Sequence, residues 1–93
     1  MNKLDTARLG IEKIDQEMLD LFEKRMDLVK EVLAYKKENN LPIFQEKREK
    51  ELIEKNLGKV KNQDYKDYYE EFFKQMLIIS KKFQEDNIWN ILA

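Results

Sequence analysis

The fold is decided by residues 4–36, which read LDTARLGIEKIDQEMLDLFEKRMDLVKEVLAYK. A series with alternating spacings of three and four residues runs through this stretch, and only one member is charged: Leu4, Ala7, Ile11, Ile14, Met18, Leu21, Arg25, Leu28, Val32 and Tyr35. This heptad seam predicts one helix over residues 4–38, roughly 50 Å long at about 1.5 Å per residue. The rest of a 93-residue chain is too short to cover such a seam. The seam therefore predicts self-association, most simply as a two-fold homodimer.

Two further helices follow the long one. Asn39-Asn40-Leu41-Pro42 is a helix end, because Asn tolerates the left-handed conformation and Pro cannot continue a helix. Gly58 and the polar stretch after it mark a second break. We therefore predict helices over about 46–57 and 63–87, then a tail over 88–93. A stripe on the third helix is interpreted as core: Tyr65, Tyr69, Phe72, Met76, Ile79 and Phe83. The fold class is all-α, with residues 1–93 as a single domain and the middle helix lying on the other two.

Composition removes several classes of function. The chain has 18 basic and 19 acidic residues and a net charge of −1, so no basic excess recruits nucleic acid or an anionic membrane. It has no Cys and no His, which excludes thiolate catalysis, catalytic triads and the commonest metal sites. No apolar run approaches a membrane span, and the first residues do not open a signal peptide. We expect a cytoplasmic protein without metal or cofactor.

The arginines are candidates for anion binding. The chain uses 15 Lys but only Arg8, Arg25 and Arg48, and Arg offers a planar fork that matches a carboxylate. A charge at seam position 25 is costly unless it is paired, so Arg25 forms either a structural ion pair or a ligand contact. Lys36 shares its helix face, about 16 Å away along the axis. Arg8 lies about 42 Å from Lys36 on the same helix, so only the Arg8 of an antiparallel partner could serve that site.

Polar residues on the other two helices are ambiguous when taken alone. Ser80 and Gln84 share a face of the third helix, and their spacing alone favours a solvent-exposed pair. Arg48 and Glu49 open the second helix and, taken alone, are a surface charge pair.

Taken together, these positions resemble the all-helical, AroQ-type chorismate mutase family. The resemblance covers about residues 4–86 and rests on these elements: Arg8-x16-Arg25, Arg25-Met26-Asp27-Leu28-Val29-x2-Val32-x3-Lys36, Pro42-Ile43, Arg48-Glu49 and Ser80-x3-Gln84. It implies an intertwined homodimer that converts chorismate to prephenate on the route to phenylalanine and tyrosine. It also implies two equivalent active sites, each built from both chains and needing no cofactor.

The resemblance also implies roles for the cationic residues. Arg25 and the partner's Arg8 would bind the two carboxylates of the substrate. Lys36 would bridge a carboxylate and the ether oxygen, and Arg48 would add positive field.

The uncharged and acidic positions receive roles in the same way. Gln84 would donate a hydrogen bond to the ether oxygen, Glu49 would bind the ring hydroxyl, and Ser80 would assist a carboxylate. Gln45 stands where the family often has Asp. If that position contributes its backbone N–H, the replacement changes little; if it contributes its side chain, binding of the hydroxyl end is affected.

Two other functions remain open. An isochorismate–pyruvate lyase on the same fold would share Arg8, Arg25, Lys36 and Gln84. The resemblance favours the mutase, because the lyase lacks the carboxylate that Glu49 supplies. A non-catalytic helical dimerisation module would use only the seam. The sequence also leaves open whether the chain is free-standing or the front domain of a bifunctional mutase–dehydratase or mutase–dehydrogenase.

Overall fold

The computed structural model describes residues 1–89, which form helices and no strands. The elements are α1 (Lys3–Glu38), α2 (Glu46–Leu57), a 3₁₀ turn η1 (Gln63–Tyr65) and α3 (Lys66–Asn87). The predicted all-α class and all three helix ranges are confirmed, with one 3₁₀ turn opening the third. The predicted tail begins where α3 has ended, and its residues 90–93 lie outside the described part of the chain.

Side chains and backbone groups at both ends of α1 explain its boundaries. The Asn2 side chain accepts a hydrogen bond from the backbone N–H of Asp5 at 2.8 Å, which caps the first turn. At the other end Asn40 has φ 55°, the left-handed conformation predicted for this position. The N–H of Leu41 then donates to the carbonyl of Lys36 at 2.7 Å, the long-range bond of a Schellman motif. The chain turns back here and leads into α2.

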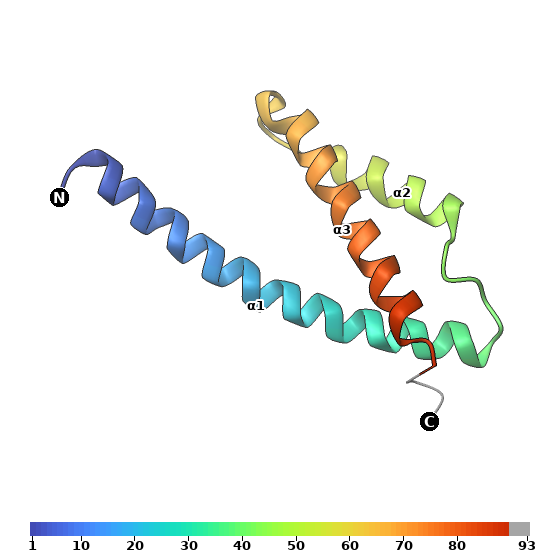
Figure 1. Ribbon diagram of the computed structural model, residues 1–93. Helices are drawn as coiled ribbons and strands as arrows, with labels where there is room; N and C mark the ends of the chain where they lie inside the picture. Colours follow the sequence, from blue (N-terminus) through green and yellow to red (C-terminus); the bar gives the residue numbers. More distant parts are fainter. Residues whose placement is uncertain (90–93) are drawn as a thin grey trace.

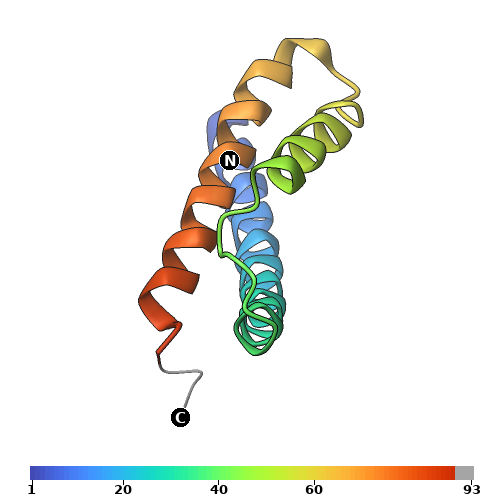
Figure 2. The same cartoon turned by 90° about the vertical axis from the view of Figure 1, so that its right-hand side faces the viewer.

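The three helices leave much of α1 uncovered. In Figures 1 and 2, α2 and α3 lie beside each other at the C-terminal half of α1, and the N-terminal half projects away from them. The main contacts of α2 are with α3, so the prediction that α2 lies on both other helices holds chiefly for α3. Every side chain in residues 1–24 is exposed. The sequence predicted that a single chain cannot cover the apolar seam, and the structure confirms this prediction.

The core is small and uses a different face of α3 from the one predicted. Its buried apolar residues are Leu33, Phe73 and Leu77. On α3 the buried face continues through Ser80 and Gln84. The predicted stripe is wrong as a core within one chain: Tyr65, Phe72 and Ile79 are 64%, 46% and 39% exposed. The stripe is offset by about 100° from the buried face, because it begins one residue away on a helix. Three of its residues, Phe72, Met76 and Ile79, instead line an apolar groove of about 500 Å³ whose other wall is α1.

The overall dimensions agree with this incomplete coverage. The molecule measures 55 × 28 × 15 Å and has a radius of gyration of 16.7 Å, against about 12 Å for a compact domain of this length. Its accessible surface is 7849 Å², whereas a compact 11.4-kDa monomer exposes roughly 5,800 Å². No helix in residues 1–89 is long and apolar enough to cross a membrane.

Candidate active site

A cavity of about 250 Å³ lies between the C-terminal half of α1, the connection before α2, the first turns of α2, and α3. Seven of the eight predicted site residues line it: Arg25, Lys36, Gln45, Arg48, Glu49, Ser80 and Gln84. These residues come from three helices and a connection, and the fold brings them to one place. Arg8 is the exception. It lies on the exposed half of α1, about 25 Å along the helix from Arg25.

Arg25 is half-buried, and its Nη1 donates a hydrogen bond to the hydroxyl of Ser80. That hydroxyl in turn donates to the carbonyl of Met76 at 2.9 Å. Within residues 1–89 the Arg25 guanidinium forms no ion pair, so no structural carboxylate compensates its charge there. A guanidinium has five N–H donors, and Ser80 uses one. Arg25 is therefore held by a neutral partner and keeps its charge for a ligand.

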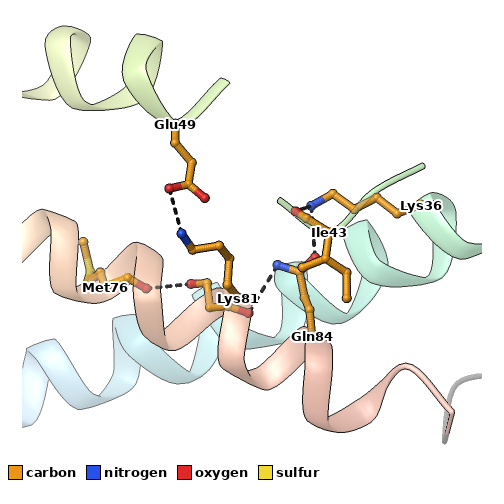
Figure 3. A network of polar contacts seen from close by, with 7 residues as sticks. Lys36, Ile43, Glu49, Met76, Lys81 and Gln84 are labelled. Atoms are coloured by element: carbon orange, nitrogen blue, oxygen red, sulfur yellow. Dashed lines mark hydrogen bonds and ion pairs between the residues drawn. The ribbon is translucent and has the colours of Figure 1, made fainter. Parts of the chain in front are cut away.

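Lys36 and Gln84 form the centre of a polar network (Figure 3). The Lys36 ammonium donates to the carbonyl of Ile43 at 2.8 Å and to Oε1 of Gln84 at 3.0 Å. The Gln84 Nε2 donates to the carbonyl of Ser80 at 3.2 Å. An ammonium can only donate, so this network fixes which end of the amide faces Lys36. Each donor group keeps one further proton for a ligand.

Burial lowers the pKa of Lys36, and the nearby Glu49 carboxylate offsets part of that effect. The charged form of Lys36 thus lies in a partly desolvated environment, where its attraction to an anion is strengthened.

Ser80 and Gln84 are 6% and 5% exposed, so the interpretation that spacing alone favoured, a surface polar pair, is wrong. Their positions continue the α3 face of Phe73 and Leu77, and this face is turned towards the cavity. Every fully buried side-chain donor or acceptor among the described residues has a partner. Both residues line the cavity, so their polar groups form part of the wall of a candidate binding site.

Sequence reasoning missed Lys81. Its ammonium forms an ion pair with Oε1 of Glu49 at 3.1 Å and lies 4.6 Å from the centroid of the Phe44 ring. Taken alone, Arg48 and Glu49 were interpreted as a surface charge pair. Glu49 pairs with Lys81 instead, although Arg48 is exposed as that interpretation required. The only signal for Lys81 was its position one residue after Ser80, and it was hidden among 15 lysines.

Gln45 occupies the N-cap position of α2, and its side chain makes no capping hydrogen bond. Its carbonyl accepts from the backbone N–H of Glu49 at 3.0 Å, which begins the helix. The sequence analysis assigned no role in the site to the apolar side chains that complete the lining and could contact a hydrophobic ligand body: Val29, Val32, Ile43, Leu52 and Leu77.

The cavity suits a compact anion with an apolar body. Four cationic side chains line it, against the single carboxylate of Glu49: Arg25, Lys36, Arg48 and Lys81. No group of three or more potential metal ligands occurs among the described residues. The fold and site together define an all-α protein with a cavity suited to a small, multiply charged anion.

Comparison with known proteins makes this class specific. The family model of chorismate mutase type II matches residues 7–85, and the chain belongs to this family. The chain is 40% identical over 57 residues to the bifunctional chorismate mutase/prephenate dehydratase of Aquifex aeolicus (strain VF5). That match covers 61% of this chain and 16% of the length of the relative. No solved structure shows a significant match to the chain.

Proposed function

We propose that this chain is a chorismate mutase, an isomerase that converts chorismate to prephenate in phenylalanine and tyrosine biosynthesis. The observation that carries the proposal is the convergence of seven family-motif residues on one cavity in a member of the chorismate mutase type II family. A cytoplasmic location and a single-domain organisation remain predictions from the sequence.

The reaction fits the groups that line the cavity. It is an intramolecular Claisen rearrangement, which needs neither a nucleophile nor a proton transfer. The site must hold the substrate in a compact, chair-like conformation and place donors where negative charge grows on the breaking C–O bond. Lys36 and Gln84 are hydrogen-bonded to each other and keep spare protons, so we assign them to the ether oxygen. An ammonium and a neutral amide provide this stabilisation without a cofactor.

The remaining groups divide between the two ends of the substrate. Arg25 with Ser80 would bind one carboxylate, because the guanidinium is already oriented by the hydroxyl. Arg48 would add positive field at the cavity edge. Glu49 and the backbone of Gln45 would meet the ring hydroxyl on the α2 side.

The second carboxylate requires a second copy of the chain, and the seam supplies its register. The ten seam positions form five pairs whose residue numbers add up to 39, for example Met18 and Leu21. An antiparallel dimer with its axis between residues 19 and 20 would therefore pair seam with seam along the whole helix. In this register the partner's Arg8 lies opposite Glu31, next to the cavity-lining Val32. That level is between Arg25 and Lys36, where a dianion needs another cation.

The activity test is the loss of chorismate absorbance, with prephenate and pyruvate assayed separately. Prephenate without pyruvate is the expected result. Pyruvate in place of prephenate would identify the lyase. Absence of both products from a folded dimer would leave only a dimerisation module.

The dimer register can be tested by cross-linking, because the chain has no Cys to interfere. We expect Met18→Cys/Leu21→Cys to form a covalent dimer under mild oxidation, since each new Cys faces one of the partner's. Lys13→Cys/Gln16→Cys has the same spacing on the opposite face of α1 and is the control. Equal cross-linking of the two variants would contradict the proposed register.

A further inference from the structure

The ion pair between Lys81 and Glu49 has no role yet, because only Glu49 was assigned a contact with the substrate. Lys81 on α3 pairs with Glu49 on α2 at 3.1 Å, and their side chains are only 25% and 20% exposed. The other ion pairs of residues 1–89 join side chains four apart within one helix and are more exposed: Lys50–Glu46 and Lys74–Glu70. Exposed pairs of that kind contribute little to stability. The Lys81–Glu49 pair differs because it connects two helices at the wall of the site.

Lys81 also reaches the connection that precedes α2. Its ammonium lies 4.6 Å from the ring centroid of Phe44, within the range of a cation–π interaction. Phe44 lies between Ile43 and Gln45, both of which line the cavity. One ammonium on α3 therefore restrains the connection and the first turn of α2 together. Figure 3 shows Lys81 extending from α3 towards Glu49.

The first turn of α2 needs such a restraint because its own sequence supplies none. The N-cap residue Gln45 makes no side-chain hydrogen bond to the helix, and no residue of α2 is buried. Without Lys81, the Glu49 side chain would be held to α3 by no ion pair among the described residues. A free glutamate loses rotamer entropy when it binds a ligand, and this loss weakens binding.

We propose that Lys81 is a positioning residue of the active site, which holds one oxygen of Glu49 so that the other oxygen accepts a hydrogen bond from the hydroxyl group of the substrate. This inference rests on the proposed mutase function, in which Glu49 meets the ring hydroxyl. Lys81 acts through Glu49 and does not itself touch the reacting atoms. Its effect should therefore be larger for ligands that carry the hydroxyl than for ligands that lack it.

The test uses two bicyclic diacids that mimic the transition state, one with the hydroxyl and one without it. Their dissociation constants are measured by calorimetry on the wild-type protein and on Lys81→Met. We expect Lys81→Met to weaken the hydroxyl-bearing diacid about tenfold, because the carboxylate that accepts this hydrogen bond loses its orientation. Binding of the deoxy diacid should weaken clearly less, about two- to threefold, since it loses only the general attraction of the Lys81 charge and Glu49 does not contact it. Lys82→Met is the matched control, because Lys82 is the exposed neighbour, and neither constant should change.

A double-mutant cycle separates positioning from a general structural role. In a Glu49→Ala background, Lys81→Met should lose its selectivity and change the binding of both diacids by the same factor. Lys81→Arg should restore most of the selectivity for the hydroxyl, since Arg also pairs with a carboxylate. Equal weakening of both diacids by Lys81→Met would show a structural role, and no weakening of either would show no role. Both results overturn the inference while wild-type activity stays intact. A wild-type protein that neither binds these diacids nor forms prephenate would overturn the proposed function itself.

Discussion

The two halves of α1 carry the same seam but have different surroundings. In residues 1–24 every side chain is exposed. In residues 25–38 the helix has a second face, through Arg25, Val29, Leu33 and Lys36, which α2 and α3 cover to different degrees. The seam itself stays exposed in this half too, as Leu28 at 60% and Tyr35 at 62% show. The half that the chain covers itself carries the cavity, and the half that it leaves bare carries Arg8.

This difference explains why a charged residue sits in the seam. Arg25 lies where the seam borders the covered face, so its head group reaches Ser80 inside the chain. The seam and the site are therefore not independent surfaces. A change in the bare half of α1 should affect catalysis only through the partner, whereas a change in the covered half should affect the site of its own chain.

The largest expected effect comes from substituting one arginine in each half of α1, on separate chains. Arg8→Ala and Arg25→Ala should each lower kcat/KM by at least about 1,000-fold, because each leaves a carboxylate of the dianion without its bidentate partner. In a heterodimer of the two variants, one site has both arginines and the other has neither. A randomly exchanged equal mixture should therefore recover about a quarter of the wild-type activity.

The measurement is prephenate formation after subunit exchange, with mixing verified by mass spectrometry of differently tagged chains. Activity that stays at the level of the separate variants would show that Arg8 and Arg25 do not serve a shared site. High activity of Arg8→Ala alone would show that the bare half of α1 has no catalytic role.

Within the covered half, Gln84→Glu should lower activity about 100-fold at pH 8, because an ionised carboxylate cannot donate and would repel the growing charge. It would also form an ion pair with Lys36, whose ammonium now contacts Oε1. Protonation restores the donor, so the variant should gain activity as the pH falls towards the pKa of the new carboxyl group. The measurement is kcat/KM from pH 4.5 to 8.5 with folding followed by circular dichroism. A variant that matches wild type at pH 8 would remove Gln84 from the ether oxygen.

The lowered pKa of Lys36 predicts opposite pH trends for the activity and the stability of the wild-type protein. Burial lowers its pKa below the ordinary value of 10.5, so at alkaline pH the folded state loses this proton before the unfolded state does. Activity should be nearly flat from pH 6 to 8 and then fall several-fold as Lys36 becomes neutral. The contribution of Lys36 to the free energy of unfolding should rise over the same alkaline window, because the unfolded state binds more protons. Both are measured against Lys36→Met, in which the part of the stability trend due to Lys36 should disappear.

These contrasts also show which parts of the molecule the sequence predicts. The helix ranges follow from local signals, since the left-handed Asn40 and the polar break after Gly58 act on their own segments. The cavity residues were predicted by type, spacing and family resemblance, and the structure brings seven of them together. The face of α3 that is buried was not predicted, because it carries only Phe73 and Leu77 as apolar residues and continues through the polar Ser80 and Gln84. Periodicity therefore favoured the more apolar neighbouring stripe, and only tertiary packing selects the buried one. Lys81 was missed for a related reason: its partners Glu49 and Phe44 are 32 and 37 residues away.

Gln45 offers a smaller effect at the edge of the covered half. Gln45→Asp should cap α2 and raise the free energy of unfolding by about 1 kcal/mol, because the Gln45 side chain provides no cap. Because the site is proposed to use the backbone of Gln45, and the family often has Asp at this position, KM for chorismate should stay within about twofold of wild type. Gln45→Asn is the matched control, since Asn caps without a charge and should stabilise the protein while leaving KM nearly unchanged. Thermal unfolding gives the first quantity and steady-state kinetics the second. No stabilisation in either variant would show that the first turn of α2 is already fully restrained.

The smallest expected effect lies in the bare half of α1. Gly10 is inside the helix, and a methyl group built on it meets no atom within 4 Å in the single chain. Gly10→Ala should therefore raise the free energy of unfolding by about 0.5–1 kcal/mol per chain, because Ala loses less backbone entropy in a helix. Gly10 flanks the seam rather than belonging to it, so the partner helix should leave room for the methyl group. Activity should stay within about twofold of wild type, since the Arg8 side chain two residues earlier is unchanged. The measurement is thermal unfolding at several protein concentrations, which separates helix stability from dimer stability. A destabilised variant with weakened self-association would indicate that the partner's backbone lies directly against Gly10. The antiparallel register about residues 19 and 20 would then have to shift, because it leaves room at that point.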